Sequence, residues 1–182
     1  MSQHTHVNRR RRWRVALLIL GLVVVLGVAL FQPWNVATLQ AHPQPAQSYA
    51  EALQRIDTLR SQETAPMNPV CQVQLLTHDR KVARAIVLVH GYTNCPHQFH
   101  ALGQQFYDLG YNVLIAPMPH HGLADRMTEM QSQLTGEELT TYADSVVDIA
   151  HGLGEHVTML GISAGGRPRH GPHKTALTLI WP

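Results

Sequence analysis

The sequence predicts an α/β domain, with a mostly parallel sheet and helices on both faces, preceded by one transmembrane helix. Three observations lead to this fold class. The chain has 182 residues, 45% of them hydrophobic, which suits one globular domain with a sizeable core. Strand-like apolar runs alternate with amphipathic helical periods along residues 67–166, an order that favours parallel pairing with helical crossovers. Val15–Phe31 is an uninterrupted apolar run without a charged side chain.

The N-terminal part has the pattern of a membrane anchor. Residues 1–14 are basic and residues 15–34 hold the apolar run, which as a helix covers about 26 Å of the ~30 Å hydrocarbon core. Trp13 and Trp34 flank it where interfacial aromatic residues are expected. The positive-inside rule predicts a single-pass protein with a cytoplasmic N-terminus and an extracytoplasmic domain. A cleaved signal peptide and a secreted domain are the alternative, since a charged start and an apolar middle fit both.

The charge distribution bears on the expected partners. Five of the fourteen basic residues fall in the first fourteen positions, and all twelve acidic residues come after residue 50. Nine basic residues therefore accompany twelve acidic ones after Phe31, a net charge of −3. A mildly acidic body gives no electrostatic reason to bind nucleic acid. The expected partner is instead the lipid bilayer, into which residues 15–31 would insert.

Residues 35–66 are expected to form a tether and a short helix. The stretch that follows the apolar run is rich in Pro, Gln and Ala, which is typical of an extended tether. The sequence "SYAEALQRIDTLR" begins with a capping box, Ser48 and Glu51, and repeats apolar residues with helical spacing. We expect this amphipathic helix to dock on the domain.

Within residues 67–166 the elements follow from periodicity and from start and stop signals. "ARAIVLVHG" is a continuous apolar run, typical of a strand buried on both faces. Thr135 and Glu138 form a capping box at the start of a long helical period. The expected strands are residues 71–78, 83–91, 111–117 and 156–163, the expected helices are 96–110 and 135–154, and 118–134 is a long loop.

The sequence "GISAG" places a serine where the last of these strands ends. Gly161 and Gly165 flank Ser163 at the G-x-S-x-G spacing, which gives the small neighbours that a sharp strand-to-helix turn requires. A glycine-rich turn without function is the plain alternative in a chain with 13 glycines. The position at a strand end favours a nucleophile.

A second segment, "VLVHGYTNCPHQF", leaves a buried strand for a loop at His90 and Gly91. A serine hydrolase stabilises its oxyanion with two amide donors, one after the nucleophile and one from an earlier strand-end loop. The amides of Ala164 and Tyr92 are the candidates here.

Taken together, "HGYTN", "GYNVLIAPMPHHG" and "GISAGG" resemble the α/β-hydrolase fold family, in particular carboxylesterases, monoacylglycerol lipases and the serine aminopeptidase group. The resemblance covers about residues 70–166. It implies the N-terminal half of an α/β-hydrolase sheet and a membrane-anchored enzyme in which Ser163 attacks a carboxylic ester or related small-molecule acyl substrate. It also implies that His120 and His121 lie near the substrate pocket and that His90 is structural.

The end of the sequence departs from this family. The fold's triad runs Ser, then Asp or Glu, then His, but no acidic residue follows Ser163. His170 and His173 lie in a stretch where Pro168 would break the expected helix. We therefore expect residues 167–182 to be an atypical tail, through a frameshift, a damaged gene or an assembly error, in an incomplete chain of doubtful activity. The alternative function is a non-catalytic membrane-tethered binding module or an inactive fragment.

The cysteines and histidines are further candidates for functional groups. Cys71 and Cys95 lie in the part predicted to be outside the cytoplasm, where a disulfide persists, and the spacing leaves a bridge and two free thiols both open. The thirteen histidines match no zinc-binding spacing. We expect no metal and no cofactor.

Overall fold

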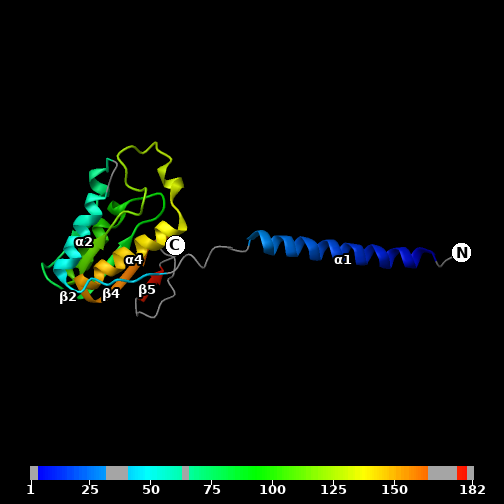
Figure 1. The fold of residues 1–182 in the computed structure, drawn as a ribbon, viewed down its shortest axis with the longest axis horizontal. Helices are drawn as coiled ribbons and strands as arrows, with labels where there is room; N and C mark the ends of the chain where they lie inside the picture. Colours follow the sequence, from blue (N-terminus) through cyan, green and yellow to red (C-terminus); the bar gives the residue numbers. More distant parts are fainter. Residues whose placement is uncertain (1–3, 32–40, 63–65, 164–175, 180–182) are drawn as a thin grey trace. The chain divides into compact units, whose positions relative to one another are not determined.

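The computed structural model describes residues 4–31, 41–62, 66–163 and 176–179. It divides into two compact units, Met1–Thr38 and Leu39–Pro182. The described part of the first unit is helix α1, and the second unit is an α/β domain (Figure 1).

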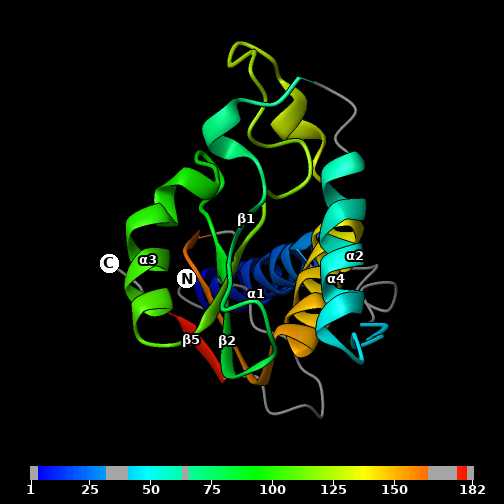
Figure 2. The ribbon, with the colours of Figure 1, turned by 90° about the vertical axis from the view of Figure 1, so that its left-hand side faces the viewer.

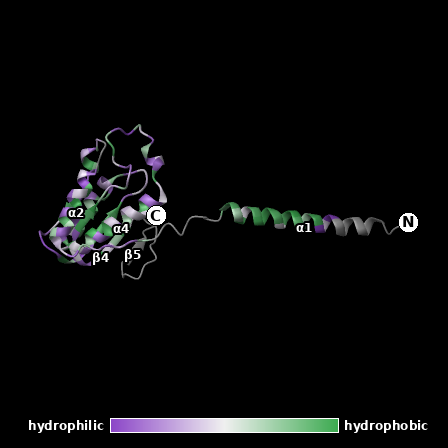
Figure 3. Ribbon diagram, in the orientation of Figure 1, coloured by the Kyte–Doolittle hydropathy of each residue, from purple (hydrophilic) through white to green (hydrophobic). Residues whose placement is uncertain are grey.

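Helix α1 (His4–Phe31) contains the apolar run (Figure 3). Its segment Arg12–Phe31 has a mean hydropathy of 2.7, none of it is buried, and it is long and apolar enough to cross a bilayer. A signal sequence would meet the same criteria. The helix starts at His4 rather than at the apolar run, because arginine is a good helix former and the basic residues extend the helix backwards.

The described residues of the second unit form a five-stranded mixed sheet in the order β1-β3-β2-β4-β5. Strands β2, β3, β4 and β5 pair in parallel, and β1 pairs with β3 in antiparallel fashion. Val87 of β2 stands between Leu114 of β3 and Met159 of β4 in the register. The strands are β1 (Gln74–Leu76), β2 (Val82–Val89), β3 (Asn112–Ile115), β4 (Gly154–Gly161) and β5 (Ala176–Leu179).

Helices cover both faces of this sheet, as predicted (Figure 2). Helices α2 (Tyr49–Ser61) and α4 (Gly136–Leu153) pack on one face, and α3 (His100–Asp108) packs on the other. Each face has its own apolar cluster, because β2 and β3 are buried on both sides. The short 3-10 helices are η2 (Pro69–Cys71), η3 (Pro96–Phe99) and η4 (Met130–Gln133).

The antiparallel edge strand differs from the parallel pairing that was predicted. A short turn separates β1 from β2, yet β1 lies beside β3 instead. The buried side chain of Asn112 holds this crossing: its Oδ1 accepts from the amide of His78 at 2.9 Å, and its Nδ2 donates to the carbonyl of Arg80 at 2.7 Å and to that of Leu153 at 2.8 Å. One amide side chain thus joins the β1–β2 turn to the end of α4.

Part of the predicted tether is fixed to the domain. The extended segment 41–46 runs along α4, where the amide of His42 donates to Asp144 Oδ2 at 2.9 Å and that of Gln44 to Asp148 Oδ2 at 2.7 Å. Asp144 and Asp148 are one helical turn apart, so both face the segment. The predicted tether is therefore held against the domain at these residues by long-range hydrogen bonds to α4.

Part of the expected tail forms a strand. Residues 176–179, expected to belong to an atypical tail, form β5 beside β4, with Thr158 opposite Ala176 and Gly161 opposite Leu179. Within the described residues, β4 is therefore paired on both sides and is not an open edge of the sheet. Pro168 and His170 lie outside the described residues.

Candidate functional site

The turn after β4 carries Ser163 in a strained backbone conformation. β4 ends at Gly161, and the amide of Ile162 still donates to the carbonyl of Val89 at 3.2 Å. Ser163 then adopts a φ of 56°, in the left-handed region, with its side chain exposed. Such a conformation costs a residue with a β-carbon about 1–3 kcal/mol and is typical of functional turns. Ala164 and Gly165, the other residues named for this turn, lie outside the described residues.

The loop after β2 lies directly against this turn. A β-carbon added to Gly91 would stand 3.9 Å from the Ser163 Cβ and 3.8 Å from the carbonyl oxygen of Ile162. The reason is the register, because β2 and β4 are paired up to Val89 and Gly161, so both chains leave the sheet at the same edge. The structure therefore brings together two segments that are more than 70 residues apart in sequence.

His90 is a structural residue in this loop. Its side chain is fully buried, and the amide of Met118 donates to its Nε2 at 3.0 Å. Nδ1 must therefore carry the proton, which it donates to the carbonyl of Gly91 at 2.9 Å. Burial lowers the pKa of His90 to about 4; the hydrogen bond to Gly91 opposes this, and the nearby His121 adds to it. The neutral ring joins the loops after β2 and β3.

The loop is further shaped by side chains that sequence reasoning missed. The amide of Gly91 donates to Gln98 Oε1 at 2.9 Å and is therefore already engaged. The amide proposed to bind an oxyanion is the next one in the chain, that of Tyr92. The Tyr92 hydroxyl donates to the carbonyl of Gln131 at 2.6 Å. No local pattern marks Gln98, which accepts through its side chain, or Gln131, which accepts only through its backbone carbonyl.

His121 is buried between the same two loops. Its Nδ1 lies 2.7 Å from the carbonyl oxygen of Pro119, and its Nε2 lies 2.8 Å from that of Tyr92. Its ring also packs at 5.4 Å from that of His90 and edge-on at 5.2 Å from that of Tyr92, measured between ring centroids. The ring thus contacts the residue proposed as an oxyanion donor, while also bordering the cavity described below.

His120, expected together with His121 near the substrate pocket, contacts the start of α4. Its Nε2 donates to Glu138 Oε1 at 3.0 Å, and its backbone φ is 64°. The backbone hydrogen bond from Thr135 lowers the pKa of Glu138, and the hydrogen bond from His120 lowers it further. Thr135 and Glu138 form the capping box predicted for α4, so His120 ties the loop after β3 to the start of that helix.

Cys71 and Cys95 are joined in a disulfide, with their Cα atoms 5.3 Å apart. The bridge links η2 to the loop that carries Tyr92. Gly122, with a φ of 77°, packs against it, and a β-carbon there would stand 2.9 Å from the Cys71 Cβ. The disulfide and His120 border a polar depression of about 360 Å³.

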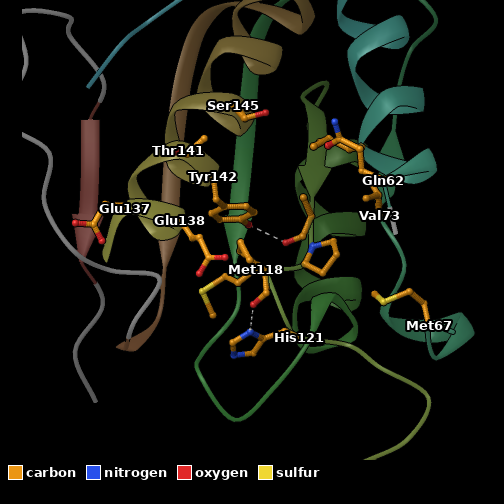
Figure 4. A pocket seen from close by; sticks show the side chains of 14 residues that line it. Gln62, Met67, Val73, Met118, His121, Glu137, Glu138, Thr141, Tyr142 and Ser145 are labelled. Carbon is orange, nitrogen blue, oxygen red and sulfur yellow. Dashed lines mark hydrogen bonds between the residues drawn. The ribbon is translucent and has the colours of Figure 1, made fainter. Parts of the chain in front are cut away.

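A larger cavity of about 500 Å³ lies between α2, the start of α4 and the loop after β3 (Figure 4). Its lining is mainly apolar, with Leu59, Met67, Val73 and Met118 among its walls and His121 at its edge. The buried Tyr142 hydroxyl donates to the carbonyl of Ala116 at 2.8 Å, and burial raises the pKa of Tyr142. Ser163 is not among the residues that line this cavity.

Among the residues that the structure describes, no three His, Cys, Asp or Glu side chains gather where they would hold a metal ion together.

No protein-family model and no curated protein sequence matches the chain significantly. Among solved structures, one match comes from work on LipS and LipT, two metagenome-derived lipolytic enzymes. It is 21% identical, with a TM-score of 0.45, over 55% of this chain and 38% of that one. This chain therefore spans well under half the length of the matched structure. Lipolytic activity is stated of the enzymes in that work.

Proposed function

We propose that the protein is a membrane-anchored serine hydrolase in which Ser163 is the nucleophile and the substrate is a carboxylic ester or related acyl compound. One observation carries the proposal: Ser163 stands in a left-handed conformation at the end of a parallel strand, against the loop of Gly91. A backbone strain of this kind at a serine supports a nucleophile turn, because it lifts the hydroxyl above the end of the sheet.

In the proposed reaction the Ser163 hydroxyl attacks the carbonyl carbon of the acyl group. A bond forms between its oxygen and that carbon, the bond to the alcohol breaks, and the alcohol leaves with the proton. Water then releases the acid and restores the hydroxyl. The amides of Tyr92 and Ala164 are proposed to stabilise the oxyanion.

The neighbouring histidines are not candidates for the general base. His90 uses one ring nitrogen for Met118 and the other for Gly91, and His121 uses its two for Pro119 and Tyr92. The fold's usual order places the base after the serine, where the sequence has His170 and His173, both outside the described residues.

Labelling of the full chain with a fluorophosphonate tests the nucleophile. We expect the wild-type protein to be labelled, the Ser163→Ala variant to stay unlabelled, and the Ser61→Ala variant, which changes an exposed serine on α2, to be labelled like the wild type. Mass spectrometry should place the adduct on Ser163. An unlabelled wild-type protein whose circular dichroism spectrum is that of a folded chain would refute the proposal.

We also propose that α1 holds the protein in a bilayer with the α/β unit outside the cytoplasm. The length and hydropathy of Arg12–Phe31 support insertion, and the arginines before it support the orientation.

The second candidate function is a non-catalytic binding module. It is favoured by the cavity between α2 and α4, whose volume lies in the range of small-molecule sites and whose lining is mainly apolar. This candidate predicts an unlabelled Ser163 together with saturable binding of an apolar fluorescent probe. Substituting Met118→Glu in the cavity wall would then abolish probe binding.

A further inference from the structure

The two ring nitrogens of His121 both contact carbonyl oxygens, and this arrangement bears on the protonation of the ring. A neutral imidazole has one N–H and one nitrogen with a lone pair, so it can donate to only one carbonyl. In the structure both ring nitrogens lie within 2.8 Å of a carbonyl oxygen, which has no proton to give. Both contacts are hydrogen bonds only when both nitrogens carry a proton, as in the imidazolium ion.

The surroundings of His121 are compatible with a positive charge. From the loop after β2 it is faced by the rings of His90 and Tyr92, and His90 is neutral, as its hydrogen bonds require. From α4, the carboxylates of Glu137 and Glu138 border the same cavity. His120 precedes it in the chain and is paired with Glu138, while Gln62 of α2, which is uncharged, lines the cavity as well.

The two carbonyls belong to different loops. Pro119 follows β3, whereas Tyr92 follows β2 and precedes the disulfide at Cys95. When the ring is neutral, one carbonyl faces a lone pair instead of an N–H, and that contact becomes repulsive. Tyr92 belongs to an exposed loop, and Pro119 stays close to the pair formed by Met118 and His90. A ring that keeps its proton on Nδ1 retains the Pro119 contact and loses the Tyr92 contact.

We propose that His121 is a positioning residue that, as an imidazolium ion, clamps the Tyr92 carbonyl to the loop after β3 and releases it when it loses a proton. The catalytic role of the clamp rests on the proposed function, in which the amide of Tyr92 binds the oxyanion. The loop is then ordered for catalysis while the ring carries both protons, and it loosens when the ring loses one of them.

Nuclear magnetic resonance of the full chain in detergent micelles, with ¹⁵N-labelled histidine and backbone, tests the clamp. The His121 ring signals are identified by their loss in His121→Gln, a variant that keeps an N–H donor but does not titrate. At low pH we expect both ring nitrogens to be protonated, and the amide signals of Tyr92 and Thr93 to shift with the same midpoint as the ring. Two results would overturn the proposal: a His121 ring that is neutral throughout about pH 5 to 8, or a Tyr92 amide signal that does not shift when the ring gains or loses its proton.

The pH profile of fluorophosphonate labelling tests the catalytic consequence. The ratio of the wild-type rate to the His121→Gln rate should fall about tenfold as the pH rises, the effect of losing one charge-assisted hydrogen bond. The control variant His156→Gln, which changes an exposed histidine near the start of β4, should follow the wild type at every pH.

The two measurements separate the clamp from the nucleophile. Labelling at Ser163 with the same pH profile in the wild type and in His121→Gln overturns the positioning role and leaves the nucleophile intact. The opposite result is a His121 ring and a Tyr92 amide whose signals shift together in a protein that fluorophosphonate never labels. It would refute the proposed function and support the clamp. Should His121→Gln fail to fold, the His121 ring signals are assigned in the wild type by correlation with the backbone signals of His121, and their titration decides the protonation state.

Discussion

His90 makes the stability of the α/β unit depend on pH, because burial lowers its pKa to about 4. The unfolded chain binds a proton at the ordinary value of about 6.5, whereas the folded chain excludes it until about pH 4. The stabilisation is therefore complete above about pH 6.5 and is lost as the pH falls to about 4. The difference between the two values corresponds to about 3 kcal/mol of unfolding free energy.

Urea denaturation followed by circular dichroism checks this, with His90→Gln as the comparison. Glutamine can accept from the Met118 amide and donate to the Gly91 carbonyl, but it does not titrate. Between about pH 7 and pH 4 the wild type should lose about 3 kcal/mol more than the variant. Parallel losses in the two proteins would contradict the assignment of a buried neutral His90.

Residues such as these show which site features a sequence can reveal. The positions of Ser163 and Gly91 after the ends of two strands were predictable, because small residues around a serine and a glycine after a buried strand are local patterns. Asn112 and Gln98 were not, since their partners are backbone groups brought close by folding. His121 was predicted as a pocket residue, but the carbonyl of Tyr92 that it contacts is 29 residues away.

Gly152 shows how closely α2 and α4 approach each other. A β-carbon at Gly152 would stand 2.5 Å from the carbonyl oxygen of Ser48 and 2.8 Å from the Ala52 Cβ. In an open helix, replacing glycine by alanine stabilises by about 1 kcal/mol. Here the methyl group has no space, because a backbone carbonyl cannot rotate away as a side chain does. We predict that Gly152→Ala destabilises the protein by separating α2 from α4.

Thermal denaturation of Gly152→Ala beside Gly103→Ala measures this effect. In α3, a β-carbon at Gly103 would stand 3.0 Å from the Cδ1 atom of Ile115, the end of a flexible side chain that can move. The gain in helix propensity should therefore leave Gly103→Ala close to the wild type, while Gly152→Ala should lower the unfolding free energy by about 1–3 kcal/mol. A stabilised Gly152→Ala would show that α2 does not pack on α4 as described.

At the scale of elements, periodicity and capping signals predicted well what is local. The capping box of Thr135 and Glu138 starts α4, and the apolar run "ARAIVLVHG" coincides with β2. The antiparallel pairing of β1 was not predictable, because it depends on the crossing that Asn112 holds. β5 was not predicted either, since the prolines and glycines before it had indicated irregular chain.

At the scale of the whole molecule, the orientation of α1 and the state of the disulfide form one prediction. The arginines before the apolar run favour a cytoplasmic N-terminus, which places Cys71 and Cys95 on the other side of the membrane. A disulfide persists there, whereas cytoplasmic thiols are kept reduced. The bridge holds η2 to the loop of Tyr92, so the orientation also decides whether this loop is constrained.

Thiol modification in intact and lysed cells measures both properties together. A maleimide linked to polyethylene glycol should modify neither cysteine of the wild-type chain before reduction and both cysteines after reduction. The Cys71→Ser variant leaves Cys95 without its partner, so it should give one adduct without reductant. Replacing the five N-terminal arginines by glutamine removes the orientation signal, so a fraction of chains should insert the other way and carry two free thiols. A wild-type chain with two free thiols before reduction would contradict the extracytoplasmic orientation. The fold brings Cys71 and Cys95 close enough for the disulfide, so only a reducing compartment would keep both thiols free.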